Sequence, residues 1–158
     1  MTTVSQKNSL SGARIRSFLA LGLLTFCVWG CSSTTLYTGL VGAKDMNLGG
    51  HAVMVSIYQL KNDTNFLRLP VESFWQDGAK SFEGDLADTK TDVMLLPGET
   101  KWLTLTLKDE TRFLGAAGDF RRPDQKGWRQ VYPLPPRRPT ELWVIIGYDG
   151  LKIEKPRK

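Results

Sequence analysis

The sequence predicts an all-β domain, a two-sheet β-sandwich with a short helical insertion. Apolar residues alternate with polar ones along most of the chain after residue 34, which is the period of a strand with one face in a core. Turns that contain glycine or proline separate these runs at intervals of roughly eight to twelve residues, as in sandwiches. A single stretch, residues 70–77, carries helix signals instead. We therefore expect about six to eight short strands in two layers.

The first two strands are expected over residues 34–43 (TTLYTGLVGA) and 51–60 (HAVMVSIYQL). In the second strand, Val53, Val55 and Ile57 share one face. The residues of its opposite face are also largely apolar: Ala52, Met54, Tyr58 and Leu60. A strand that is apolar on both faces should be covered on both sides.

The helical insertion is expected over residues 70–77, within LPVESFWQDG. Pro70 suits a first helical position, Glu72 stands in the first turn, and Gly78 is a stop signal. Phe74 and Trp75 should pack this helix on a sheet. A second short turn is expected near residues 82–87.

Further strands are expected on either side of two turn signals. Pro97-Gly98 separates VMLLPGE from KWLTLTL, in which the leucines at alternate positions (Leu103, Leu105 and Leu107) face inward. TRFLGAAGDF predicts a strand whose glycines let neighbours approach closely. ELWVIIGYDGLKIE predicts a hairpin around Asp149-Gly150. The proline-rich residues 132–139 are interpreted as a stiff exposed connection, with a polyproline ligand as the alternative.

The amino-terminal segment has the pattern of an export signal. Three basic residues and no acid precede an apolar run, residues 18–28, that is far shorter than the ~20 residues of a membrane-spanning helix. Val28-Trp29-Gly30-Cys31 follows and resembles the lipobox of bacterial lipoprotein precursors, in which the cysteine is acylated and becomes the first residue. Residues 1–30 are then a removed signal, 31–35 a lipidated tether, and 36–155 the sandwich domain.

The two cysteines also fit an ordinary signal that happens to contain them, or a metal or redox pair of Cys27 and Cys31. The pair lacks further ligands, since no histidine or acid lies within ten residues. Two or three acyl chains would hold Cys31 on a bilayer essentially permanently. Ser32 follows it, and in sorting of the enterobacterial kind this predicts the periplasmic face of the outer membrane.

The charge of the mature chain is close to neutral. Removing three of the 21 basic residues leaves 18 − 16 = +2, so the chain has no strong attraction to nucleic acid. Lysines and arginines cluster between residues 121 and 138 and in the C-terminal tail. They indicate a solvated surface, or a site for an acidic partner or lipid headgroups. With no second cysteine after cleavage, the domain depends on its hydrophobic core.

The inventory of side chains argues against catalysis and against a metal or cofactor other than the lipid. His51 is the sole histidine, so a serine triad would need it beside Ser56, Ser73 or Ser81, none of which lies in a recognisable motif. No phosphate-binding glycine motif is present in the sequence. We therefore expect a protein that is not an enzyme.

Four motifs in order, LVGAKDMN, VMVSIYQLKNDTNF, LLPGETKWLTL and RFLGAAGDFRRPDQKGWR, span the mature chain. Together with the lipobox they resemble the TssJ family, the outer-membrane lipoproteins of bacterial type VI secretion systems. The resemblance implies a transthyretin-like β-sandwich with an added helical segment. It also implies binding to the periplasmic carboxy-terminal part of TssM, an inner-membrane component, within a complex that contains TssL.

In the TssJ family, the loop between the first two strands contributes to TssM binding. The matching residues here are Asp45, Met46, Asn47, Leu48, Gly49, Gly50 and His51. Beside the two glycines, Met46 and Leu48 would be exposed on a mobile tip and could anchor a partner. In the plainer interpretation this is a β-turn whose Leu48 folds back and whose His51 begins a strand.

The sequence thus predicts a lipid-anchored scaffold that tethers a TssM-like protein to the outer membrane. The alternative is a general periplasmic lipoprotein that acts as an assembly chaperone or carries a small ligand. A carrier should contain a sizeable apolar pocket, whereas a scaffold should have a filled core and a protein-binding loop.

Overall fold

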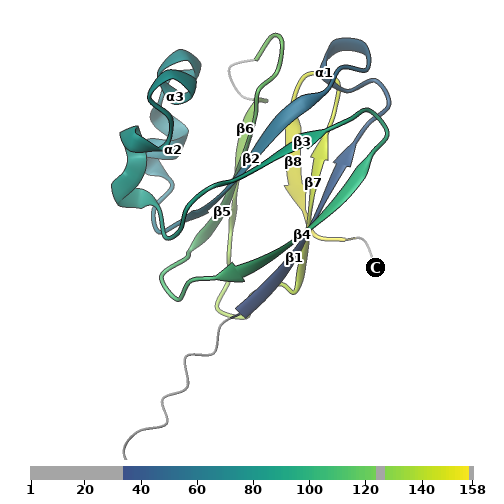
Figure 1. Cartoon of the computed structure of the whole chain (residues 1–158). Coiled ribbons are helices and arrows are strands. Elements are labelled where there is room, and N and C mark those ends of the chain that lie inside the picture. The colour runs from purple at the N-terminus through teal and green to yellow at the C-terminus, as the bar shows by residue number, and fades with distance from the viewer. Residues whose placement is uncertain (1–33, 124–126, 157–158) are drawn as a thin grey trace, which may run out of the picture. The chain divides into compact units, whose positions relative to one another are not determined.

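Two four-stranded sheets pack face to face in the computed structural model, which describes residues 34–123 and 127–156 (Figure 1). Sheet A has the strand order β4-β1-β7-β8, and sheet B the order β3-β2-β5-β6. The strands are β1 (Thr34–Gly42), β2 (Val53–Leu60), β3 (Thr91–Leu95), β4 (Thr100–Leu107), β5 (Phe113–Gly118), β6 (Arg129–Pro133), β7 (Glu141–Ile146) and β8 (Leu151–Glu154). The predicted β-sandwich is therefore confirmed.

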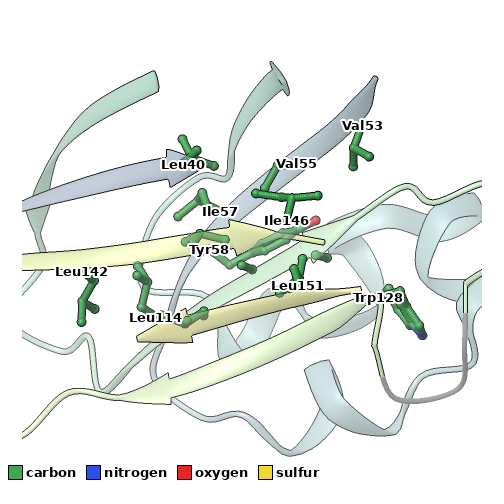
Figure 2. Packing of buried hydrophobic residues seen from close by; sticks show 14 of the residues in the cluster. Leu40, Val53, Val55, Ile57, Tyr58, Leu114, Trp128, Leu142, Ile146 and Leu151 are labelled. Carbon is green, nitrogen blue, oxygen red and sulfur yellow. The ribbon is translucent and has the colours of Figure 1, made fainter. Parts of the chain in front are cut away.

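The core lies between the inner faces of the two sheets (Figure 2). Leu36 of β1 pairs with Leu105 of β4, and both are buried. Sheet B contributes Val55 and Ile57, also buried. Each fully buried aliphatic side chain stabilises the fold by about 1.5–3 kcal/mol, so the alternation of the strands supplies most of the driving force. The expected inward leucines of β4 are confirmed.

Three short helices cover the outer face of sheet B: α2 (Thr64–Arg68), α3 (Val71–Asp77) and the 3₁₀ helix η1 (Gly78–Asp85) (Figure 1). They bring Phe66, Phe74 and Phe82 onto Tyr58 in edge-to-face contacts with ring centroids 5.2–5.9 Å apart. Gly115 of β5 leaves room for this cluster, because a Cβ there would lie 3.0 Å from Leu60 and 3.1 Å from Phe66. Covering on both sides explains the unbroken burial of β2 from Val55 onward.

The helical insertion begins one residue later than expected. Pro70 is the N-cap rather than the first helical residue of α3. Gly78 ends the helix, as predicted, and its φ is 58°. The glycine is required there, since a positive φ is costly for other residues. Helix α2 and strand β6 were not predicted from the sequence, and β2 begins at Val53 rather than at His51.

A tertiary contact holds these two unpredicted elements together. The guanidinium of Arg129, in β6, stacks 4.4 Å from the ring centroid of Trp128 and donates hydrogen bonds to the carbonyl oxygens of Phe66 and Leu67. Burial lowers the pKa of Arg129. Trp128 and Phe120 are both buried, and they anchor this part of the chain to the core.

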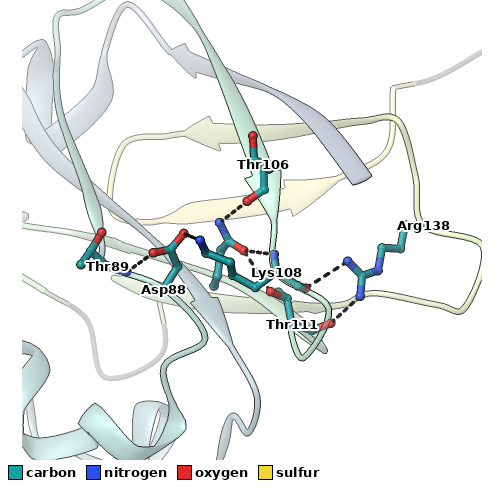
Figure 3. A network of polar contacts seen from close by, with 7 residues as sticks. Asp88, Thr89, Thr106, Lys108, Thr111 and Arg138 are labelled. Atoms are coloured by element: carbon teal, nitrogen blue, oxygen red, sulfur yellow. Dashed lines mark hydrogen bonds and ion pairs between the residues drawn. The ribbon is translucent and has the colours of Figure 1, made fainter. Parts of the chain in front are cut away.

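At the end of the sandwich where β1 begins, a polar network joins the sheets (Figure 3). The side chain of Gln59 donates to the carbonyl of Thr106 at 3.0 Å and accepts from the backbone of Lys108 and the hydroxyl of Thr111. Arg138 donates to the carbonyl oxygens of residues 108, 109 and 111. The proline-rich segment is therefore braced against the β4–β5 turn, as a stiff connection should be.

Candidate functional site

The loop predicted to bind a partner lies at the far end of β1, where α1 (Met46–Gly49) joins β1 to β2 (Figure 1). It is a left-handed turn rather than a regular helix. Asn47 and Leu48 have φ values of 51° and 62°, followed by 105° and 90° at Gly49 and Gly50. The glycines adopt this conformation without strain and asparagine tolerates it, but leucine does so rarely. Backbone strain at Leu48 marks this turn as a candidate functional element.

Two backbone hydrogen bonds join the left-handed turn to the β7–β8 hairpin. The N–H of Asn47 donates to the carbonyl of Gly147 at 3.1 Å, and that of Leu48 donates to Tyr148 at 2.8 Å. The predicted hairpin is confirmed, and its turn covers residues 147–150. Gly150 is needed there because a Cβ would lie 2.7 Å from the carbonyl oxygen of Gly127.

The side chain of Asn47 is buried and ties two further segments to the turn. Its amide nitrogen donates to the carbonyl of Ala52 at 2.8 Å, and its amide oxygen accepts from the backbone N–H of Arg121, also at 2.8 Å. The turn is thus bonded to the start of β2, to the segment after β5 and to the β7–β8 hairpin. These contacts make it a defined surface, in contrast to the mobile loop that was expected.

Met46 is fully buried, so the expectation that it is exposed was wrong. Its side chain enters the core beside Gly42, where an added Cβ would lie only 2.6 Å from the Met46 sulfur. The left-handed turn directs residue 46 inward because it bends the chain back over the end of β1. Leu48 is half-buried, while Asp45, Gly49 and His51 are exposed.

Two exposed apolar side chains of other segments join Leu48 at this end of the sandwich. They are Leu96 and Tyr148, each 52% exposed. Leu48 bonds to the backbone of Tyr148, and the β3–β4 turn that carries Leu96 bonds to Gly42 through the N–H of Gly98 at 3.0 Å. We call this surface the tip, and it consists of residues 44–51, 96–98, 121–122 and 147–150.

Charged side chains of both signs surround these apolar groups. The exposed ones are Lys44, Asp45, Arg121, Arg122 and Asp149. An apolar centre with a mixed polar rim is the usual anatomy of a protein-binding surface. Leu96 and Tyr148 were not predicted as site residues. Only their place beside the turn signals Pro97-Gly98 and Asp149-Gly150 could have indicated them.

Two of the polar groups considered for catalysis, His51 and Ser56, have other partners. The Nε2 atom of His51 lies 2.7 Å from Nη1 of Arg121, which can donate to it. Ser56 donates to Asp92 at 2.6 Å. Burial opposes ionisation of Asp92, but hydrogen bonds from Lys90 and Ser56 outweigh it and lower its pKa. The structure therefore does not bring His51 to Ser56.

Residues 34–123 and 127–156 contain no cluster of metal-ligating side chains and no helix with the length and apolarity to span a bilayer. Cys31, predicted to carry the lipid, lies outside the described residues.

Comparison with known proteins identifies relatives of the whole domain. The family model described as type VI secretion lipoprotein, VasD, EvfM, TssJ matches residues 34–153. The crystal structure of the T6SS lipoprotein TssJ1 from Pseudomonas aeruginosa is 27% identical, with a TM-score of 0.71 over 80% of this chain and 99% of that chain. None of the curated proteins compared with the chain matches it.

Two further solved structures contain similar chains. A chain of a structure described as a type VI membrane complex is 25% identical, with a TM-score of 0.69 over 78% of this chain and 99% of that one. A chain of a structure described as the T6SS protein TssM C-terminal domain, from EAEC, is 27% identical, with a TM-score of 0.62 over 77% of this chain and 98% of that one.

Proposed function

Because this chain belongs to the TssJ family of type VI secretion lipoproteins, we propose that it tethers a TssM-like protein to the outer membrane as a lipid-anchored component of the secretion membrane complex. It acts by binding and holding, and has no catalytic role. The described side chains support this role, since they form a contiguous hydrophobic core and a partly exposed apolar tip.

The anchor of this proposal is a covalent lipid on Cys31, exposed when residues 1–30 are removed. Residues 31–35 then form the tether and residues 36–155 the domain. The lipobox-like Val28-Trp29-Gly30-Cys31 and the lipoprotein family support it. Ser32 supports placement on the periplasmic face of the outer membrane.

The partner is the periplasmic carboxy-terminal domain of the TssM-like protein, in a complex that also contains TssL. The likeness to a chain from a structure named for the TssM C-terminal domain supports the first of these partners. The binding surface is the tip, and it includes the predicted residues Asp45, Leu48, Gly49, Gly50 and His51. Met46 and Asn47 contribute from inside by fixing the turn.

The arrangement of β1 is the observation that carries this proposal. Its first residue, Thr34, comes three positions after Cys31, and its last, Gly42, leads into the tip. At about 3.3 Å per residue, the eight steps from Thr34 to Gly42 separate the two ends by roughly 26 Å. The tip therefore lies at the opposite end of β1 from the end that follows the anchor, where a partner that comes from the inner membrane can reach it.

Calorimetric titration of residues 32–158 with the periplasmic domain of the TssM-like protein tests the proposal. We expect saturable binding that weakens at least about tenfold in Leu48→Ser and Leu96→Ser, as for anchors at the centre of an interface. Leu67→Ser is the matched control, because Leu67 is similarly exposed, at 45%, but belongs to α2. Absence of binding by the folded domain would favour the chaperone or carrier instead.

A further inference from the structure

The outer face of sheet A carries three large aromatic side chains. Trp102 of β4 and Trp143 of β7 both pair with Gly39 of β1, so they flank it across three adjacent strands. Their ring centroids are 5.1 Å apart with planes at 78°. A Cβ at residue 39 would lie 3.2 Å from the Trp102 ring, so the glycine lets the two indoles close over the strand. Tyr37 lies two residues earlier on β1, and we call these three aromatic residues the aromatic face.

The aromatic face is accessible to a ligand. Tyr37 is 52% and Trp102 54% exposed, whereas the outer face of sheet B is covered by α2, α3 and η1. Trp143 already has its polar partner, since its indole N–H donates to Glu141 at 2.6 Å. The neighbouring outward side chains are hydroxyls and half-buried aliphatics: Thr35, Thr100, Thr104, Thr106, Val41 and Ile145. Amphipathic rings among hydroxyl groups suit the boundary between water and an apolar phase.

The length of chain before β1 indicates what covers this face. Thr34 lies only three positions after Cys31, a stretch that spans at most about 11 Å when fully extended. Tyr37 lies three residues further along the strand, about 10 Å away. An acylated Cys31 therefore keeps the start of the aromatic face within reach of lipid headgroups. Tryptophan and tyrosine are the side chains that concentrate at this level of a bilayer.

We propose that the aromatic face rests on the headgroup region of the phospholipid bilayer that holds Cys31. The inference depends on the anchor of the proposed function and adds an orientation to it. Few charges share this face: Lys152 and Glu154 of β8, which pair with Ile145 and Trp143, and Glu141 of β7, which accepts the hydrogen bond from Trp143. Contact therefore depends on the aromatic rings more than on salt-sensitive attraction. In this orientation, sheet B and its helices face the periplasm and the tip lies at the rim of the contact.

The test uses the acylated protein in vesicles of phosphatidylethanolamine and phosphatidylglycerol. The only cysteine of the mature chain is the lipidated one, so a single introduced cysteine can carry a polarity-sensitive fluorophore. Thr104→Cys places the probe beside Trp102 on the outer face of sheet A. Ser81→Cys, in η1, places it on an exposed site over sheet B. We expect lipids spin-labelled at the headgroup to quench the first probe several-fold more than the second.

Replacing both tryptophans, Trp102→Thr with Trp143→Thr, should reduce quenching at residue 104 to the level of residue 81, while thermal unfolding shows that the domain remains folded. Equal quenching at the two sites in the parent protein would overturn the proposal. The proposal would also be overturned if the fluorescence of the probe at residue 104 rose with the amount of protein per vesicle at a fixed amount of lipid. That result would mean that the aromatic face contacts other copies of the protein.

Flotation of the same vesicles separates this inference from the anchor. Protein that floats with the lipid, but is quenched equally at both sites, rejects the aromatic contact and leaves the anchor intact. Protein that does not float rejects the anchor, and the orientation with it.

Discussion

The buried amide oxygen of Asn47 accepts a hydrogen bond of 2.8 Å from the backbone N–H of Arg121, 74 residues further along the chain. This contact joins the loop after β1, a strand of sheet A, to the segment after β5, a strand of sheet B. The same residue sits at φ 51° and donates to Ala52. Its side chain therefore maintains both the conformation and the position of the left-handed turn.

Asn47→Ala should destabilise the domain and weaken partner binding. The change leaves the backbone N–H of Arg121 and the carbonyl of Ala52, both in partly buried hydrogen bonds, without their partner. Each such loss costs about 1–3 kcal/mol when the group is shielded from water. We expect the free energy of unfolding in urea to fall by about 2–4 kcal/mol. Asn65→Ala, on the exposed side of α2, is the control and should stay near the parent value. An unchanged midpoint for Asn47→Ala would show that water replaces both bonds.

Leu48→Gly should be more stable than Leu48→Ala. Both changes remove the same contacts beyond Cβ, but only glycine relieves the φ of 62°. We expect the glycine variant to have a free energy of unfolding about 1 kcal/mol higher than the alanine variant. Both should bind the TssM-like domain equally weakly in calorimetry. An alanine variant at least as stable as the glycine variant would refute backbone strain at this position.

Gly150→Ala should destabilise the β7–β8 hairpin. Its Cβ would lie 2.7–3.0 Å from backbone atoms of Gly127, which cannot rotate away. We expect a loss of about 1–3 kcal/mol in the free energy of unfolding. Gly84→Ala is the matched control, because no atom lies within 4 Å of its added Cβ. Equal stability of the two variants would mean that the backbone near Gly127 shifts without cost.

Tyr58→Phe should make the domain less sensitive to alkali. Burial raises the pKa of Tyr58 from 10.0 to about 12, so the folded state favours the neutral phenol. The neutral phenol therefore contributes up to about 2–3 kcal/mol to the free energy of unfolding. This contribution is complete below pH 10 and is lost as the pH rises toward 12. Urea unfolding at a series of alkaline pH values should show a shallower decline in the variant. Parallel declines in the two proteins would contradict a raised pKa at this residue.

Cys31→Ser should abolish incorporation of a radioactive fatty acid in cells. The hydroxyl cannot form the thioether to lipid, so the precursor keeps its signal and its higher mass. Cys27→Ser is an internal control, because it removes the other cysteine and leaves Val28 to Cys31 unchanged. Undiminished label in Cys31→Ser would refute the anchor.

The sequence predicted those strands in which apolar and polar residues alternate. Leu103, Leu105 and Leu107 are separated by polar residues, and they face the core as expected. By contrast, β6 contains Arg129, Gln130 and Pro133, which carry no such alternation. It is a strand because β5 offers it an open edge, and because Arg129 bonds to the helix over that sheet. No local pattern contains this information.

The candidate site was likewise predicted only in part from the sequence. The motif order indicated the loop at residues 45–51, but exposure of its side chains depends on neighbours that are distant in sequence. Met46 is buried because Gly42 leaves space for its sulfur, and Leu96 and Tyr148 join the surface because two other turns end beside it.

By itself, the sequence determined the period-two strands, the helical break near Pro70, the candidate anchor at Cys31 and the family resemblance, because local spacing and composition carry these signals. Only the tertiary structure decided which strands share a sheet, which way Met46 faces, and that Trp102 and Trp143 meet over Gly39. These features depend on register between segments far apart in the chain, which is set by packing rather than by any one segment.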